Sequence, residues 1–121
     1  MQTKELPSIY EINTSVWLKE LSNHYHQPLS IGTVPNEEWK RLGHLGFNLI
    51  WLMGIWSKSE VSRQIALTSP ELKTAYSQLN PNWQEQDIEG SPYAVSNYIP
   101  NPDIGSFQEL DKVRDFLHER G

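Results

Sequence analysis

Aromatic side chains are the residues of this sequence best suited to bind a ligand. Five Trp and five Tyr occur among 121 residues. Such rings usually pack a core, but an exposed ring also presents an apolar face on which a sugar can stack. Trp56 ends an apolar run, whereas Tyr93 and Tyr98 lie in a stretch rich in Pro, Asn and Gly. We expect these three rings to form a weak oligosaccharide-binding surface, or else to pack the loop around them.

Histidine and acidic side chains offer weaker candidates, in this case for metal ligands. His24 and His26 flank Tyr25 without a third ligand nearby in sequence, so we expect both to be solvated. The acidic residues among positions 85–89 would suit calcium, although a solvated acidic loop is the simpler interpretation. The sequence therefore predicts no metal and no cofactor. The absence of cysteine excludes disulfides and thiol catalysis.

Composition narrows the possible partners. The formal net charge is -5 and no Lys/Arg cluster occurs, which argues against nucleic acid or an anionic membrane surface. Residues 1–7 lack the apolar core of a signal peptide, and no apolar run reaches membrane-spanning length. We therefore expect one modest domain, residues 1–121, located in the cytoplasm.

An apolar run at residues 45–56 indicates how the candidate residues are positioned. It follows a predicted helix at 36–45, whose Trp39, Leu42 and Leu45 recur at a spacing of three. The run is nearly continuous, which favours a strand at 47–53 buried on both faces of a parallel sheet. A first strand is predicted at 8–13. In such α/β folds, active sites gather at the carboxyl ends of the strands.

The remaining segments read mainly as helices and loop. Capping patterns predict helices after Ser57, Ser69 and Ser106, whereas residues 83–103 read as an irregular loop. Only two strands are predicted, and a two-stranded parallel pair leaves open edges. The pattern therefore suggests the beginning of a larger α/β domain.

Four segments, taken in order, resemble the N-terminal part of the α-amylase family of glycoside hydrolases, family 13. They are IYEI at 9–12, LGFNLIWL at 45–52, SPYAVSNY at 91–98 with NP at 101–102 and IGS at 104–106, and LHERG at 117–121. The resemblance implies the N-terminal portion of a (β/α)8 TIM barrel: strands one and two, their helices, and a long second βα loop at residues 54–106.

The resemblance also implies substrate-binding residues. Tyr93 matches the loop tyrosine that stacks on the sugar at the cleavage subsite. Asn97 stands where the family often has an aspartate, just before Tyr98, and Ala94 stands where it often has an acid. Trp56 ends the second strand and is placed to line the cleft or to pack it.

The catalytic carboxylates of the family lie on later strands that match nothing in this sequence. Retaining hydrolysis needs two carboxyl groups about 5–5.5 Å apart, and no pair here can be assigned to that role. We therefore expect a fragment of an enzyme acting on α-glucosidic bonds, inactive alone. The alternative is a non-catalytic module that binds carbohydrate or protein. Expected partners are an α-glucan, the missing barrel half, or a second copy pairing through open strand edges.

Overall fold

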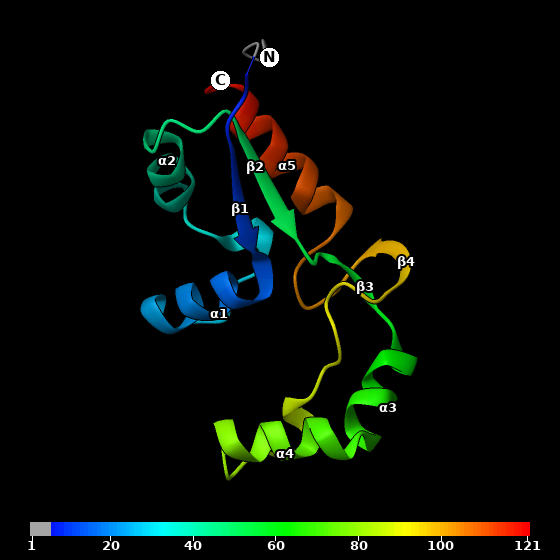
Figure 1. Ribbon diagram of the computed structural model, residues 1–121. Helices are drawn as coiled ribbons and strands as arrows, with labels where there is room; N and C mark the ends of the chain where they lie inside the picture. Colours follow the sequence, from blue (N-terminus) through cyan, green and yellow to red (C-terminus); the bar gives the residue numbers. More distant parts are fainter. Residues whose placement is uncertain (1–5) are drawn as a thin grey trace. The chain divides into compact units, whose positions relative to one another are not determined.

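The computed structural model describes residues 6–121 and separates the chain into two compact units (Figure 1). The first unit is Met1–Ile55 together with Pro100–Gly121, and the second is Trp56–Ile99. The expectation about a leader segment rests on residues 1–7, and the first five of these lie outside the described residues. None of the described helices is long and apolar enough to cross a membrane.

The first unit combines a parallel strand pair with helices. Its elements are β1 (Ile9–Asn13), α1 (Thr14–Tyr25), the 3-10 helix η1 (Ile31–Thr33), α2 (Asn36–His44), β2 (Leu49–Met53) and α5 (Phe107–His118).

Register in the first sheet is set at the start of both strands. Ile9 pairs with Leu49, and the pairing runs parallel to Asn13 and Met53. Just before the strands, the Ser8 carbonyl accepts hydrogen bonds from the backbone N–H groups of Asn48 and Leu49 at 3.0 and 3.1 Å. The Asn48 side-chain oxygen accepts one in return from the Ser8 N–H at 3.1 Å.

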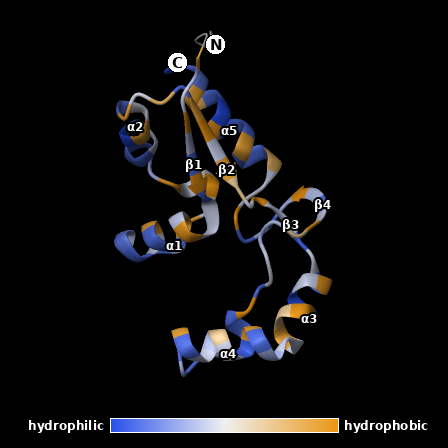
Figure 2. Cartoon of the chain, viewed as in Figure 1, coloured by the Kyte–Doolittle hydropathy of each residue, from blue (hydrophilic) through white to orange (hydrophobic). Residues whose placement is uncertain are grey.

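The core of this unit packs against the sheet face that carries Ile12 and Leu52. Figure 2 colours much of β2 as hydrophobic. The core joins residues from β1, α1, α2 and α5 with others from the loops between elements. Its buried members are Ile12, Leu18, Leu21, Leu29, Ile31, Val34, Trp39, Leu42, Ile104 and Val113.

Two expectations about burial are wrong. Trp39 and Leu42 are buried as the spacing predicts, but Leu45 is 51% exposed because it follows the last turn of α2. Trp51 is 54% exposed, so β2 is not buried on both faces. Side chains alternate between the faces of a strand, and the core covers only the face that carries Ile50 and Leu52.

The second unit is built from short elements. They are β3 (Trp56–Lys58), α3 (Glu60–Thr68), α4 (Pro70–Leu79), the 3-10 helix η2 (Glu85–Asp87) and β4 (Val95–Pro100), whose last residue is counted with the first unit.

Two of the three N-cap residues predicted from the sequence cap helices in the structure. Ser69 and Ser106 accept backbone hydrogen bonds at the starts of α4 and α5, as their spacing predicts. The cap of α3 is Ser59, which accepts from the Ser62 N–H at 3.3 Å. Ser57 lies in β3, so the capping box assigned to it is wrong by two residues.

The expected portion of a (β/α)8 barrel is also wrong. The described residues contain four short strands in two separate two-stranded sheets, β1–β2 and β3–β4, in a mixed α/β arrangement. The error arises at residues 83–103, which read as an irregular loop because they lack apolar alternation. Backbone pairing with β3 nevertheless makes a strand of residues 95–100, and that strand joins a second sheet instead of extending the first.

Candidate functional site

All four sequence-predicted binding residues lie in the second unit. Trp56 begins β3, Asn97 and Tyr98 lie in β4, and Tyr93 belongs to the turn just before β4. The site can therefore be described within one compact unit.

Trp56 and Tyr98 face each other across the β3–β4 sheet. Their ring centroids are 5.6 Å apart and the rings are inclined at 83°, an edge-to-face contact. Trp56 is half-buried, whereas Tyr98 is 76% exposed. The tryptophan thus supports the tyrosine from the side and leaves most of the phenol ring open to a ligand.

Cross-strand hydrogen bonds hold this pair of strands together. The Ser59 N–H donates to the Ala94 carbonyl at 2.8 Å, and the Ser57 hydroxyl donates to the Ile99 carbonyl at 2.8 Å. Early residues of one strand thus meet late residues of the other, so the pair is antiparallel. This antiparallel pairing brings Tyr98 into contact with Trp56.

Asn97 does not join the two rings. Successive side chains of a strand point to opposite faces, so Asn97 and Tyr98 lie on different faces of β4. The Asn97 amide oxygen accepts a hydrogen bond from the Ile99 N–H at 3.2 Å. The Asn97 side chain thus forms a hydrogen bond within its own strand and does not contribute to the ring pair.

Ser96 is a polar neighbour that sequence reasoning missed. It stands two residues before Tyr98, on the same face, and its hydroxyl donates to the Ser57 carbonyl at 3.2 Å. Because the hydroxyl donates its proton to Ser57, the Ser96 oxygen can still accept a hydrogen bond from a ligand. The only signal in the sequence is the two-residue spacing, which becomes informative once β4 is known to be a strand.

Tyr93 presents a second exposed ring. Its side chain is 58% exposed, and its backbone N–H donates to the Ser91 hydroxyl at 3.2 Å. The turn that carries Tyr93 precedes β4, so this ring is not fixed by the strand pairing that positions Tyr98. It therefore adds a separate aromatic surface close in sequence to β4.

Arg63 of α3 anchors the loop that leads into this turn. Its guanidinium donates from Nε to the Ile88 carbonyl at 2.9 Å and from a terminal nitrogen to the Glu85 carbonyl at 3.3 Å. Gly90 has φ +79°, and a Cβ there would lie 2.9 Å from the Arg63 backbone nitrogen. Any larger residue at position 90 would push the loop away from α3.

The weaker metal-ligand candidates are His24, His26 and the acids of residues 85–89. The described residues include no group of three or more His, Asp or Glu placed to hold a metal ion. Asp87 accepts from the Gln84 N–H at 2.8 Å, and Glu89 forms an ion pair with Lys58. The two acids thus have structural partners.

Carboxyl groups with a shifted pKa lie in the first unit, away from these rings in sequence. Burial raises the pKa of Glu38, but hydrogen bonds from Tyr25 and Arg41 outweigh it and hold the pKa below its usual value. A hydrogen bond from Ser30 is the main reason that the pKa of Glu109 is also lowered. Both shifts favour the ionised form, whereas a catalytic acid needs a raised pKa.

Comparison with known proteins adds no relative. No family model, curated protein or solved structure matches this chain. A function for the chain must therefore be inferred from the geometry of the described residues and from the family resemblance in the sequence.

Proposed function

We propose that this chain binds α-linked gluco-oligosaccharides, without cleaving them, at the Trp56–Tyr98 ring pair. The observation that carries the proposal is the exposure of the Tyr98 ring, 76%, in a side chain supported edge-to-face by Trp56. Removing apolar surface from water is favourable, so an exposed ring gains free energy when a ligand covers it. A supported and exposed ring is a platform on which a pyranose can stack.

The surroundings of the platform suit a sugar hydroxyl. Ser96 lies on the same strand face, and its oxygen retains acceptor capacity beside the ring. The Tyr98 phenol is able both to donate and to accept at the ring edge. One platform with so few polar groups gives a weak site, with a Kd on the order of 1 mM.

The α-glucosidic preference comes from the resemblance of four ordered segments to the α-amylase family, one of which is residues 91–98. We propose accordingly that the sugar-binding role belongs to carbohydrate metabolism in the cytoplasm. Tyr93 supplies a second contact when the oligosaccharide is long enough to reach its exposed ring. Hydrolysis by this chain alone is not expected, because the catalytic carboxylates that the family resemblance implies match no residues of this sequence.

Titration with maltoheptaose tests the proposal, using cellopentaose as the β-linked comparison. Two-dimensional NMR of ¹⁵N-labelled protein follows the Tyr98 amide and the Trp56 indole N–H. We expect saturable shifts at both groups with maltoheptaose and at least about threefold weaker binding of cellopentaose.

Three variants separate ring stacking from general effects. Tyr98→Ala should abolish saturable binding, whereas Tyr98→Phe should retain most of it because the ring face is kept. Ile99→Ala is the matched control, since Ile99 is an exposed apolar residue on the opposite face of β4. Unchanged binding in Tyr98→Ala, or equal losses in Tyr98→Ala and Ile99→Ala, would refute the assignment of the site.

A further inference from the structure

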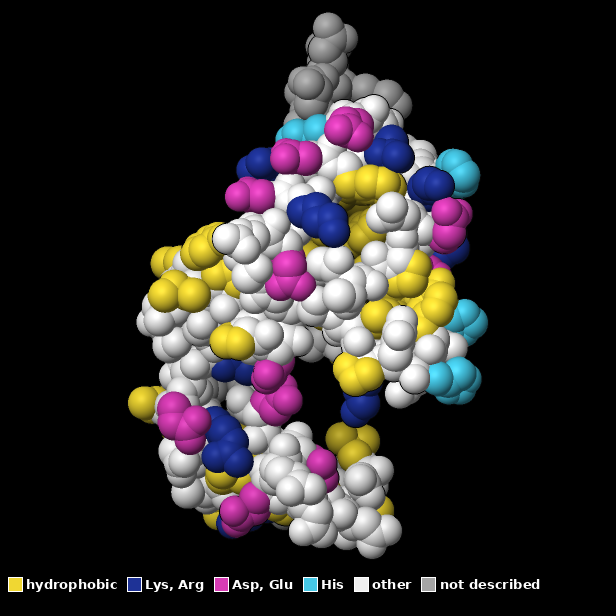
Figure 3. Space-filling model, turned by 180° about the vertical axis from the view of Figure 1, so that it is seen from behind, with side chains coloured by type: hydrophobic (Ala, Val, Ile, Leu, Met, Phe, Trp, Pro, Cys, Tyr) yellow, Lys and Arg dark blue, Asp and Glu magenta, His cyan; other side chains and the backbone are white. Residues whose placement is uncertain are grey.

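One ion pair of the second unit differs from the others among the described residues. Lys58 of β3 pairs with Glu89, 31 residues later in the chain. The other ion pairs of residues 6–121 join side chains one or three positions apart. Figure 3 shows Asp and Glu side chains beside Lys and Arg side chains in several places. Ion pairs are thus common on this surface, and the Lys58–Glu89 pair is distinguished by joining distant segments.

The two partners of this ion pair are exposed to different degrees. The Lys58 side chain is 16% exposed, whereas that of Glu89 is 63% exposed. The ammonium group donates to Oε2 of Glu89, and within residues 6–121 no group donates to Oε1. A carboxylate can accept about four hydrogen bonds. The pair therefore shields the cation and leaves most of the acceptor capacity of the carboxylate open to a ligand.

The backbone on either side of Glu89 is held against α3. The Ile88 carbonyl accepts from Nε of Arg63 at 2.9 Å, and the Ser91 N–H donates to the Ser62 hydroxyl at 3.2 Å. Glu89 is thus fixed through its neighbours in the chain and through its own side chain. A group that is already ordered loses less entropy when it binds a ligand.

This ion pair shares a strand face with the Trp56–Tyr98 ring pair. Side chains two residues apart on a strand point to the same side, about 7 Å from each other. Lys58 therefore lies beside Trp56 on the face where Trp56 contacts Tyr98. Its ion pair brings the carboxylate of Glu89 to the same face. An exposed ring and a fixed carboxylate then stand on one surface.

We propose that Glu89 is a sugar-binding residue, which accepts hydrogen bonds from hydroxyl groups of the sugar unit next to the one stacked on Tyr98. Lys58 is the positioning residue that holds the Glu89 carboxylate in place. The role of Glu89 rests on the proposed sugar binding at Tyr98 and narrows the class of ligand. An ionised carboxylate can only accept hydrogen bonds, so the ligand must donate from its hydroxyl groups and carry no negative charge nearby.

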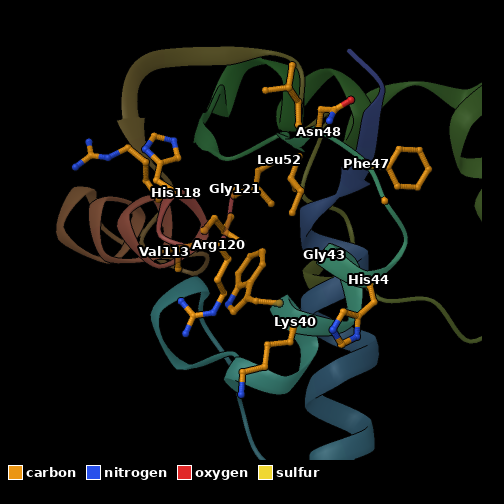
Figure 4. Close-up of a pocket in the computed structure, with 16 residues that line it drawn as sticks. Lys40, Gly43, His44, Phe47, Asn48, Leu52, Val113, His118, Arg120 and Gly121 are labelled. Carbon is orange, nitrogen blue, oxygen red and sulfur yellow. The ribbon is translucent and has the colours of Figure 1, made fainter. Parts of the chain in front are cut away.

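The apolar groove of the first unit offers no comparable site. It has a volume of about 670 Å³, lies between α2 and α5 beside β2, and has Trp39 and Phe47 as its aromatic lining residues. Trp39 is only 2% exposed, and Figure 4 shows the Phe47 ring lying apart from the side chains of Lys40 and Val113. No Asp or Glu side chain of the described residues lines the groove. It therefore lacks a fixed carboxylate beside an exposed ring.

Titration with maltoheptaose, followed at the Tyr98 amide and the Trp56 indole N–H, tests the role of Glu89. Glu89→Gln keeps the shape of the side chain and removes its charge, so it should weaken binding about five- to tenfold. Glu85→Gln is the matched control. It makes the same charge change at an exposed position of η2, where the side chain forms no ion pair with another described residue. We expect this control to bind as tightly as wild type.

An acidic sugar separates hydrogen bonding to Glu89 from a general loss of structure. The probe is maltoheptaose oxidised to the carboxylic acid at C6 of its glucose units. Wild type should bind it at least about fivefold more weakly than maltoheptaose because like charges repel, and Glu89→Gln should reduce that difference to about twofold or less. A variant that merely loosened the loop would weaken the binding of both ligands equally.

Lys58→Met tests the positioning role. It should weaken maltoheptaose binding about two- to fivefold because the carboxylate is less ordered. The double variant with Glu89→Gln should bind no more weakly than Glu89→Gln alone, since Lys58 acts through Glu89. Lys58→Arg keeps a donor to the carboxylate and should restore most of the affinity.

The outcomes distinguish the role of Glu89 from the sugar site itself. Wild-type affinity in Glu89→Gln, equal losses in Glu89→Gln and Glu85→Gln, or an unchanged preference of Glu89→Gln against the acidic probe would overturn the role of Glu89 alone. No saturable binding of maltoheptaose by wild type would overturn both the Tyr98 platform and the role of Glu89.

Discussion

Glu109 clamps α5 to η1, and neutralising it should reduce stability in a pH-dependent way. One carboxylate oxygen accepts from the Ser30 hydroxyl at 2.5 Å and from the Gly32 N–H at 3.1 Å, partners 79 and 77 residues away in the sequence. Glu109→Gln removes the charge that strengthens both bonds while keeping the shape of the side chain. The two chain segments should then be held together less firmly.

The magnitude follows from the two bonds. A hydrogen bond to a charged group contributes roughly 1.5–3 kcal/mol, and partial exposure of Glu109 places the total near the lower end of that range. We therefore expect Glu109→Gln to lower the free energy of unfolding by about 2 kcal/mol at pH 7. With a urea m-value of about 1–2 kcal/mol/M, the midpoint should fall by about 1–2 M.

The pH dependence of this loss has a definite sign. The folded pKa of Glu109 lies below its ordinary value of 4.5, chiefly because of the Ser30 hydrogen bond. The unfolded state therefore binds the proton first as pH falls, and the stabilisation is present above about pH 4.5 and disappears as pH falls through the folded pKa. The difference between wild type and Glu109→Gln should shrink accordingly in acid.

Urea unfolding followed by circular dichroism, at pH 7 and at stepwise lower pH, measures both quantities. Glu119→Gln is the matched control, because it removes an exposed carboxylate just beyond the same helix. We expect that control to change the midpoint very little. A Glu109→Gln midpoint equal to wild type at pH 7, or a difference that persists unchanged in acid, would refute the clamp.

Three further predictions concern packing and capping in the first unit. A Cβ at Gly32 would lie 2.6 Å from the Glu109 Oε1, so Gly32→Ala should displace that side chain. In urea unfolding, the stability losses of Gly32→Ala and Glu109→Ala should be clearly less than additive in the double variant. Full additivity would contradict the contact. Leu42→Ala should lower the free energy of unfolding by about 2–5 kcal/mol because Leu42 is buried. Leu45→Ala should change it by no more than about 0.5 kcal/mol. Thermal unfolding that ranks the two variants the other way would show that α2 packs on another face. Ser106→Ala should cost about 1 kcal/mol through loss of the α5 cap, measured by the same melts, and a neutral result with unchanged helix content would show that the cap contributes nothing.

Local chemistry allowed much of the secondary structure to be predicted from sequence. Ser69 followed by Pro70 predicts the start of α4, and Ser106 predicts the start of α5, because a capping side chain acts on N–H groups a few residues away. The spacing of Trp39 and Leu42 likewise predicts which face of α2 is buried. In each case the determining interactions lie within one or two helical turns, or follow from helical periodicity alone.

β4 and the division into two sheets escaped prediction for the opposite reason. Residues Ser96 to Ile99 are all exposed, so the strand has no alternating apolar pattern. It exists because its backbone meets β3, about 40 residues earlier in the chain, as in the 42-residue separation of the Ser57–Ile99 hydrogen bond. Pairing over such a distance depends on the whole fold.

Two of the helix starts and the buried stripe of α2 could be inferred from the order of amino acids, whereas sugar binding by Trp56, Tyr93 and Tyr98 stays a prediction. The folded chain was needed to place Tyr98 against Trp56, to put Asn97 on the other strand face and to join Glu109 to Ser30. Folding also brought Trp39 of α2 and Val113 of α5 together around one apolar groove beside β2. The difference lies in the range of the interactions: caps and helical faces depend on neighbours, whereas these sites require chain segments that are distant in sequence to meet.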